Sequence, residues 1–286
     1  MTRTVAILGA GPVGLAAAAH VLERGMRPLI LEQGAEVGHS VRAWGHVPMF
    51  SNWRSSIRAA AARRLEHARW QAPDPEAYPT GAELVEDYLQ PLGQTLAPWL
   101  RFERHIVAVS REGIDKVNNA GHGTTPFMID TEGATGEARN GADAVTDATG
   151  TWFQPNPGGA GRPVPGELGH LRFGYGMPDV TGQEQARRGG KRVAVLGGGH
   201  SAMGTLIALS NLSGTSPIWL CRASTTTRAR GGGAADRLAA RGVLGTGMAR
   251  SVDGGGIRLE KRVSSCRRLR DHPADGRIGW RGHRGG

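Results

Sequence analysis

The sequence predicts an α/β protein built on two strand–turn–helix units, each with a glycine-rich turn at its centre. The first is VAILGAGPVG at residues 5–14, and the second is VAVLGGGHSA at residues 193–202. In both, an apolar run typical of a buried parallel strand leads into the glycines, and a helix-forming segment follows. Such a turn presents main-chain N–H groups at a helix N-terminus to a phosphate. A chain with two of them is therefore expected to hold two dinucleotides.

Length and composition place the chain among globular proteins. Its 286 residues are 39% hydrophobic, enough to bury the core of one large domain or two smaller ones. The apolar run at 6–21 is interrupted by glycines and a proline and is shorter than the roughly 20 residues that cross a membrane. We therefore expect a cytoplasmic protein without a membrane partner. The two cysteines, Cys221 and Cys266, are too few for a disulfide framework, a CxxC pair or a metal site, so no metal is expected.

The net charge of +10 raises the question of a nucleic-acid partner. From Arg250 to the end of the chain, ten Lys and Arg stand against four Asp and Glu, so most of the excess belongs to this tail. A basic face over the whole protein is thus not indicated.

The first unit contains every part of a dinucleotide site. Thr4–Leu8 is expected to be a strand and Leu15–Leu22 a helix. Gly9 permits the tight turn, Gly11 lets the main chain approach a pyrophosphate, and Gly14 lets helix and strand pack closely. The helix N-terminus then holds the phosphates.

The second strand of this unit, Pro28–Leu31, ends at Glu32, 18 residues after Gly14. A carboxylate there accepts hydrogen bonds from a ribose and repels a 2′-phosphate. The first unit is therefore expected to bind FAD or NAD rather than NADP. A glycine turn without a ligand is the alternative.

The second unit differs from the first in the sign of its charge. Lys191–Leu196 is expected to be a strand and Met203–Leu209 a helix, and the next strand, Pro217–Cys221, ends at Arg222. A guanidinium at that place binds a 2′-phosphate, which favours NADPH; a solvent-facing Arg222 is the alternative. The residues expected to contact NADPH are Gly197, Gly199, His200, Ser201, Ala202 and Arg222. A catalytic role for His200 stays open.

Together with these turns, VTDATGTW (145–152) and PNPGGAGRPVPGE (155–167) resemble the flavin-containing monooxygenases and their relatives among the flavoproteins with two dinucleotide-binding domains. The resemblance runs from Thr4 to about Val243. It implies a three-layer, doubly wound, Rossmann-like FAD-binding domain at 1–160 and an inserted Rossmann-like NADPH-binding domain at 161–263.

The resemblance also assigns residues to FAD. It places the ATG segment of 148–150 against the cofactor, and the main chain near Val107, in an expected strand at 102–109, against the adenine. It implies a helix at 79–89, which Thr80 and Glu83 are spaced to cap. The complete set expected to contact FAD is Gly9, Gly11, Pro12, Val13, Gly14, Glu32, Val107, Ala148, Thr149 and Gly150.

Two departures from the family limit this interpretation. The FxGxxxH signature of many monooxygenases is absent, because residues 171–180 are LRFGYGMPDV. A short helical run at 234–240, a possible strand at 257–263 and an Arg- and Gly-rich tail at 264–286 follow Arg222. The tail is expected to be disordered. It belongs either to a chain that ends before its FAD domain is complete, which we favour, or to an RNA-binding segment, which would carry more aromatic residues.

The segment at 38–54, GHSVRAWGHVPMFSNWR, is rich in aromatic residues. Family position implies a loop beside the flavin that excludes water, and an aromatic mini-core under a loop is equally compatible. His46 is a minor candidate for an acid or base, and no catalytic residue is assigned.

These features predict an FAD-dependent, NADPH-using oxidoreductase, specifically a monooxygenase that transfers one oxygen atom from O₂ to a small molecule. An NAD(P)H-dependent flavin reductase or oxidase shares every residue named above, and an inactive remnant is a third possibility. The expected partners are a small-molecule substrate and O₂.

Overall fold

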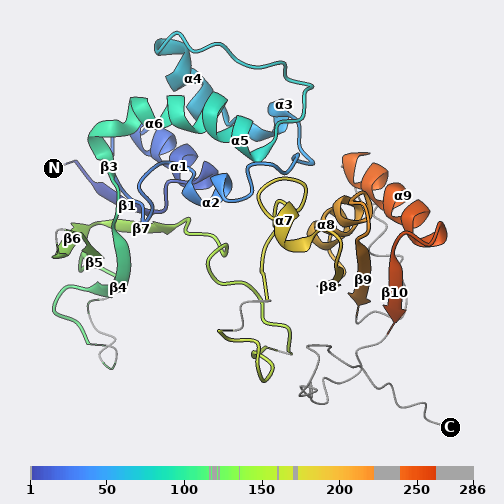
Figure 1. The fold of residues 1–286 in the computed structure, drawn as a ribbon. Helices are drawn as coiled ribbons and strands as arrows, with labels where there is room; N and C mark the ends of the chain where they lie inside the picture. The colour runs from blue at the N-terminus through green and yellow to red at the C-terminus, as the bar shows by residue number, and fades with distance from the viewer. Residues whose placement is uncertain are drawn as a thin grey trace. The chain divides into compact units, whose positions relative to one another are not determined.

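The computed structural model describes residues 2–115, 117, 121, 123–134, 136–159, 161–169, 173–221 and 239–261 (Figure 1). The chain divides into two compact units, Met1–Phe153 and Gln154–Gly286. The predicted domain limits at 160 and 263 stay predictions. Within the described residues, no helix combines the length and the apolar character needed to cross a bilayer.

Unit 1 is organised by a parallel four-stranded sheet in the order β3-β2-β1-β7. Its strands are β1 (Thr4–Leu8), β2 (Arg27–Leu31), β3 (Leu100–Arg101) and β7 (Ala144–Asp147). In the register, Leu8 at the end of β1 lies opposite Leu31 of β2 and Asp147 of β7. Every residue of β1 is buried, as expected for a strand at the centre of a parallel sheet. The strands predicted around the first glycine turn are confirmed.

Helices cover one face of this sheet (Figure 1). They are α1 (Pro12–Glu23), α4 (Ala59–His67), α5 (Gly81–Glu83) and α6 (Gln90–Leu96), with a π-helical stretch η1 (Leu84–Leu89) between the last two and a 3₁₀ turn η2 (Ala97–Trp99) after them. The fully buried Leu15, Leu65 and Leu92 join α1, α4 and α6 in one core. The predicted capping box is confirmed, because Thr80 Oγ1 accepts from the Glu83 N–H at 3.2 Å and Glu83 Oε2 accepts from the Thr80 N–H at 2.7 Å.

An antiparallel sheet covers the opposite face (Figure 1). It consists of β4 (His105–Arg111), β5 (Phe127–Gly133) and β6 (Gly136–Ala142). The buried Ile129 and Ala142 pack against Ala6, Leu8 and Leu31 of the parallel sheet. The predicted three-layer arrangement is confirmed. Its third layer is a sheet, so unit 1 is not doubly wound with helices on both faces, and the predicted strand at 102–109 begins three residues later.

The segment at 38–54 forms two short helices, α2 (His39–Arg42) and α3 (Trp53–Ser56). Trp53 is 4% exposed and belongs to the helical core, while the Trp44 ring lies so close to Gly81 that a Cβ there would be 2.8 Å from it. These contacts favour the mini-core interpretation for both tryptophans. His46 is exposed.

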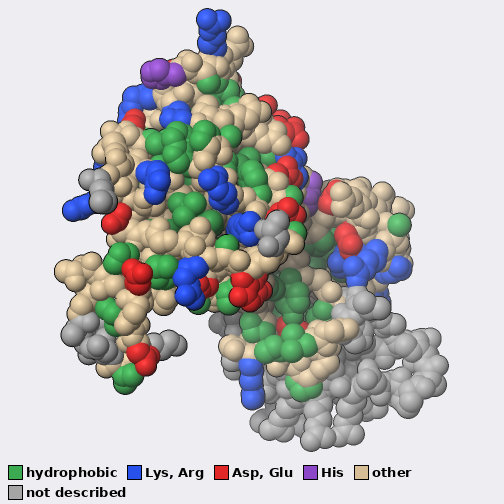
Figure 2. Space-filling view, turned by 90° about the vertical axis from the view of Figure 1, so that its left-hand side faces the viewer, with side chains coloured by type: hydrophobic (Ala, Val, Ile, Leu, Met, Phe, Trp, Pro, Cys, Tyr) green, Lys and Arg blue, Asp and Glu red, His purple; other side chains and the backbone are tan. Residues whose placement is uncertain are grey.

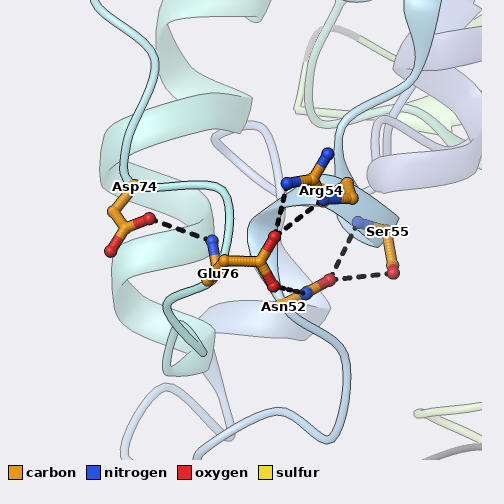
Figure 3. A network of polar contacts seen from close by, with 5 residues as sticks. All are labelled: Asn52, Arg54, Ser55, Asp74 and Glu76. Carbon is orange, nitrogen blue, oxygen red and sulfur yellow. Dashed lines mark hydrogen bonds and ion pairs between the residues drawn. The ribbon is translucent and has the colours of Figure 1, made fainter.

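A surface network fastens α3 to the segment that follows α4 (Figure 3). Glu76 accepts hydrogen bonds from Arg54 Nε at 2.8 Å and from Asn52 Nδ2 at 3.2 Å. Asn52 also caps α3, because its Oδ1 accepts from the Ser55 N–H. The Asp74 carboxylate accepts from the Glu76 N–H at 3.0 Å.

Unit 2 contains a parallel sheet in the order β10-β9-β8. Its elements are α7 (Gln185–Arg188), β8 (Arg192–Leu196), α8 (His200–Ser210), β9 (Ser216–Cys221), α9 (Ala239–Asp253) and β10 (Arg258–Lys261). Met203 and Leu206 of α8, Trp219 of β9 and Met248 of α9 form its core. The predicted β8, α8 and β9 are confirmed, and the predicted strand at 257–263 is β10 as far as residue 261. Most of the predicted helix at 234–240, and the tail at 264–286, lie outside the described residues.

Candidate dinucleotide-binding sites

Two glycines of the first turn lie against protein atoms, and a third faces open space. Gly9 has a positive φ of +103°, and a Cβ on it would lie 2.7 Å from the carbonyl oxygen of Ala148. A Cβ on Gly14 would lie only 2.0 Å from the carbonyl oxygen of Gly9. Gly11 has no atom within 4 Å of the place where its Cβ would stand. A side chain at Gly9 or Gly14 would therefore clash with the main chain, whereas the space at Gly11 is open to a ligand.

Helix α1 begins at this opening. Its N-cap is Gly11, which offers no side-chain acceptor, and no acidic residue stands in the first turn. The N–H groups of the first turn and the positive end of the helix are thus available to an anion. Pro12 at the first helical position has no N–H to satisfy, and the Val13 side chain is 67% exposed beside the opening.

Glu32 is a buried carboxylate between the turn and the next loop. It is 6% exposed, and its two oxygens accept the Ala10 N–H at 2.6 Å and the Gly34 N–H at 2.8 Å. A carboxylate has about four lone-pair positions, so these two bonds leave acceptor capacity for ribose hydroxyls. The carboxylate thus orders the turn and also presents the chemistry expected of a ribose acceptor.

The strand that carries Val107 is tied to Glu32 through the main chain. The Arg104 N–H donates to the Glu32 carbonyl at 2.9 Å. Three residues on, β4 has an irregular register: Ile106 lies opposite Thr131 and Ala108 opposite Asp130, so Val107 is the extra residue of a bulge. A bulged residue is left out of the ladder, and the Val107 side chain is 55% exposed. Its position suits a main-chain contact with a ligand.

The ATG segment lies directly against the glycine turn. The Ala148 N–H donates to the Leu8 carbonyl at 2.9 Å, which continues β7 alongside the end of β1. Asp147 Oδ1 accepts the Thr149 N–H at 3.0 Å and the Thr149 hydroxyl at 2.7 Å. These bonds hold the pKa of Asp147 below its ordinary value. Gly150 follows with a φ of +67°.

A histidine that the sequence reasoning missed extends this cluster. The His39 ring stacks on Phe153, with ring centroids 5.8 Å apart and 22° between the planes. His39 follows Gly38, whose N–H donates to the Ala10 carbonyl at 3.0 Å, so the pair belongs to the same corner of unit 1. No local pattern could have paired His39 with Phe153, because the fold brings their distant segments together.

Unit 1 therefore gathers the glycine turn, the start of α1, Glu32, Val107 and the ATG segment around the ends of β1, β2 and β7. These features fit FAD: an open glycine at a helix start for the pyrophosphate, a buried carboxylate for the ribose, and small residues where the chain passes closely.

The second glycine turn has the same design in unit 2. Gly197 has a φ of +145°, its N–H donates to the Leu220 carbonyl at 3.0 Å, and its own carbonyl accepts from Trp219 Nε1 at 2.6 Å. Gly198 and Gly199 have no atom within 4 Å of their Cβ positions. The N-cap of α8 is Gly199, and no acidic residue stands in its first turn. Trp219 thus fixes the carbonyl of Gly197, while the space next to Gly198 and Gly199 is open to a ligand.

The remaining predicted NADPH residues divide between described and undescribed parts of the chain. His200 and Ser201 start α8, and the Ala202 Cβ lies 3.4 Å from where a Gly197 Cβ would stand, consistent with close helix–strand packing. Arg222 lies outside the described residues. Among those that are described, no group of His, Cys, Asp and Glu side chains is arranged to hold a metal ion.

The resemblance segment at 155–167 ends in a buried glutamate that organises the loop around it. Glu167 is 3% exposed and accepts the Tyr175 hydroxyl at 2.5 Å and the Gly158 and Val164 N–H groups at 2.7 Å each. The Tyr175 bond, followed by the two main-chain bonds, lowers the pKa of Glu167. We infer a structural role for this carboxylate.

A glutamate with a lowered pKa stabilises the folded loop above its unfolded pKa, and that stability is lost as the pH falls through the folded value. We therefore expect the protection of the Gly158 and Val164 amides, relative to their intrinsic exchange rates, to be high above about pH 5 and to fall on acidification below the ordinary glutamate value of 4.5. Glu167→Gln should lower this protection already at neutral pH, whereas Glu184→Gln at the half-buried pair with Arg188 should not. Equal protection in all three proteins would contradict this role.

The comparisons with known proteins agree with this architecture. The family model for the FAD-binding domain matches residues 4–197. The matched region spans most of unit 1 and the first strand of unit 2, and it defines the class as proteins with an FAD-binding domain. The chain belongs to the FAD-binding domain family. No curated protein matches it.

Three solved structures illustrate the shared fold. The bacillithiol disulfide reductase of Bacillus cereus has a TM-score of 0.65 at 19% identity, over 91% of this chain and 68% of the reductase. A flavin-containing monooxygenase from Stenotrophomonas maltophilia gives 0.51 at 24%, over 80% and 67%. The OTEMO complex with FAD and NADP gives 0.52 at 18%, over 77% and 39%. At these identities the likeness shows the fold, an FAD-binding Rossmann-like domain with an inserted second domain.

Proposed function

We propose that the protein is an NADPH-using flavin monooxygenase that acts on a small molecule. The observation that carries this proposal is the pair of open glycine turns, one beside buried Glu32 in unit 1 and the other in unit 2. A flavoprotein needs a second dinucleotide-binding site only if another nucleotide supplies electrons to the flavin. The cytoplasmic location, the small-molecule substrate and the lack of membrane or nucleic-acid partners belong to the same proposal.

In unit 1, Gly11, Pro12 and Val13 at the start of α1 would hold the pyrophosphate of FAD, with Glu32 on the ribose and the bulge at Val107 on the adenine. FAD, when bound, supplies two-electron redox chemistry with nicotinamides and with O₂. Residues 148–150 would line its other side. The role of the protein's residues is to bind, to orient and to exclude water.

In unit 2, Gly197, Gly199 and the start of α8 would receive the pyrophosphate of NADPH, and Arg222 its 2′-phosphate. The structure named as a complex with FAD and NADP supports a two-nucleotide arrangement for this fold. It does not bear on the choice of NADPH over NADH, which rests on Arg222 in the sequence.

The second candidate is a flavin reductase or oxidase that does not oxygenate a substrate. It is favoured by the likeness to bacillithiol disulfide reductase, which extends over more of this chain than the likeness to the Stenotrophomonas monooxygenase. The sequence has no CxxC pair to serve a thiol-based mechanism, so electrons would leave by way of O₂ or another acceptor.

The deciding experiment is the absorption spectrum of the purified protein before and after anaerobic addition of NADPH. A flavin band that bleaches supports both nucleotide sites, whereas a colourless protein that takes up no added FAD contradicts the proposal and indicates a remnant. Readmission of O₂ then separates the two candidates. Hydrogen peroxide equal to the NADPH consumed, with every substrate tested, would favour the oxidase.

Arg222→Ala is expected to raise the Kd for NADPH about tenfold or more, through loss of a charge-assisted contact, and to leave the Kd for NADH nearly unchanged. Titration of each nucleotide with the purified protein measures both values. Arg192→Ala, at the opposite end of β8, is the control and should change neither Kd. Equal weakening of NADH and NADPH would remove Arg222 from the 2′-phosphate site.

A further inference from the structure

A groove of about 460 Å³ lies in unit 1 at the end of β1 and β2 away from the glycine turn. Thr4 and Arg27 at the starts of these strands line it, together with Trp99 before β3, Arg101 of β3, and Arg139 and Asn140 of β6. Figure 2 looks onto the side of this unit that carries the N-terminus, β3 and β6, where Lys and Arg side chains (blue) are spread over the surface. Among the described residues that line the groove, none is Asp or Glu.

Two of its three arginines have no carboxylate partner within the described part of the chain. The Arg27 guanidinium donates to the Thr4 hydroxyl, from Nε at 3.2 Å and from Nη2 at 2.9 Å. Arg101 Nη1 donates to the carbonyl oxygens of Pro98 at 3.1 Å and Leu100 at 2.7 Å. Both guanidiniums therefore keep their full charge and several free N–H donors.

The third arginine is compensated. Arg139 Nε donates to Asp130 Oδ1 at 2.6 Å, and this exposed pair holds the guanidinium along β6. The groove thus has two uncompensated positive charges, while Asp130 occupies the Nε and Nη2 donors of Arg139. Like charges gathered in this way repel one another, and the repulsion is relieved when an anion binds between them.

The end of the groove formed by Thr4 and Arg27 lies away from the proposed flavin site. It lies at Thr4, the first residue of β1, whereas the glycine turn begins after Leu8, so the strand puts about 13 Å between them. Arg101 lies nearer to that site, because it pairs with Leu31 and its carbonyl accepts the Glu32 N–H at 2.9 Å. Its guanidinium, however, donates to the carbonyls of Pro98 and Leu100 and not to Glu32.

We propose that this groove binds a small phosphate-bearing molecule. Its volume lies within the range of about 300–1,000 Å³ that is usual for small-ligand sites. Each guanidinium offers a planar fork that matches two phosphate oxygens, and the two uncompensated charges balance a phosphate dianion. The Thr4 hydroxyl, which accepts from Arg27, has its own hydrogen to donate, and Trp99 forms an apolar wall beside it. The proposal does not rest on flavin binding.

The test is calorimetric titration of the chain with inorganic pyrophosphate at constant ionic strength. We expect saturable binding whose Kd rises about tenfold in Arg27→Gln and in Arg101→Gln, since each loses a charge-assisted contact. Arg54→Gln, which removes an exposed arginine of the Figure 3 network, should leave the Kd unchanged. The glycine turns also attract pyrophosphate, so only binding that depends on the two groove arginines supports the proposal.

Two outcomes would overturn it. One is the absence of saturable binding to the wild-type chain, and the other is an unchanged Kd in both groove variants. Because Arg27 also anchors Thr4, the thermal midpoint of each variant is measured without ligand. If Arg27→Gln is unstable, Arg101→Gln decides the question, because the Arg101 guanidinium donates to carbonyl oxygens of its own segment and Arg101→Gln leaves the main-chain pairing of β3 in place.

Discussion

Gly14→Ala is expected to lower the free energy of unfolding of unit 1 by about 3 kcal/mol or more and to abolish flavin retention. The added Cβ would lie 2.0 Å from the Gly9 carbonyl oxygen. That oxygen is main chain, and it has no room to withdraw: the Gly9 N–H donates to the Leu31 carbonyl at 2.7 Å, and the Cα of Gly9 faces Ala148. Relief of the clash must therefore separate α1 from β1. Denaturant unfolding followed by circular dichroism measures the loss.

Gly11→Ala is the matched control, since it adds the same methyl group three residues away in the same turn. Its Cβ would meet no protein atom within 4 Å, and the φ of −79° suits any residue. Loss of glycine as the N-cap costs about 1 kcal/mol or less. The methyl group would instead stand in the space proposed for the pyrophosphate, so flavin retention should fall while the fold persists. A Gly14→Ala protein as stable as Gly11→Ala would show that helix and strand are not packed as described.

The two glycine turns could be predicted from sequence because everything that forms them is local. The apolar β1, the glycines and the start of α1 are consecutive, so their spacing alone marks the turn. The structure adds the steric reason for each glycine, which is closeness to Ala148 for Gly9 and to the turn itself for Gly14. Glu32 follows from the fixed length of the strand–helix–strand unit. The same reasoning found β8, α8 and β9.

The antiparallel layer could not be predicted in the same way. β6 has the sequence GEARNGA, which shows no apolar alternation, and of its residues only Ala142 is buried. Pairing with β5 along its whole length, rather than side-chain burial, makes it a strand. The contact of His39 with Phe153 could not be predicted for a related reason, because it depends on how segments far apart in the sequence of unit 1 pack together.

Glu32→Ala is expected to lower the free energy of unfolding of unit 1 by about 2 to 4 kcal/mol and to weaken flavin retention more than tenfold. The carboxylate accepts the Ala10 and Gly34 N–H groups, and with Glu32 only 6% exposed its loss leaves both donors without an acceptor away from water. Each such donor costs about 1 to 3 kcal/mol. Flavin loses the ribose acceptor and also the ordered turn. Denaturant unfolding and equilibrium titration with FAD measure the two effects separately.

Glu76→Ala is the matched control, because the Glu76 carboxylate bonds to two residues, as the Glu32 carboxylate does, but is exposed where Glu32 is buried. It binds Arg54 and Asn52 in the network of Figure 3, but its side chain is 63% exposed. Water replaces the lost carboxylate there, so the expected cost is less than about 1 kcal/mol and the affinity for FAD should not change. If Glu32→Ala destabilised the protein no more than Glu76→Ala, burial of the Glu32 carboxylate would not be what orders the turn. If it destabilised unit 1 while the affinity for FAD held, Glu32 would be a structural residue and the ribose would have another partner.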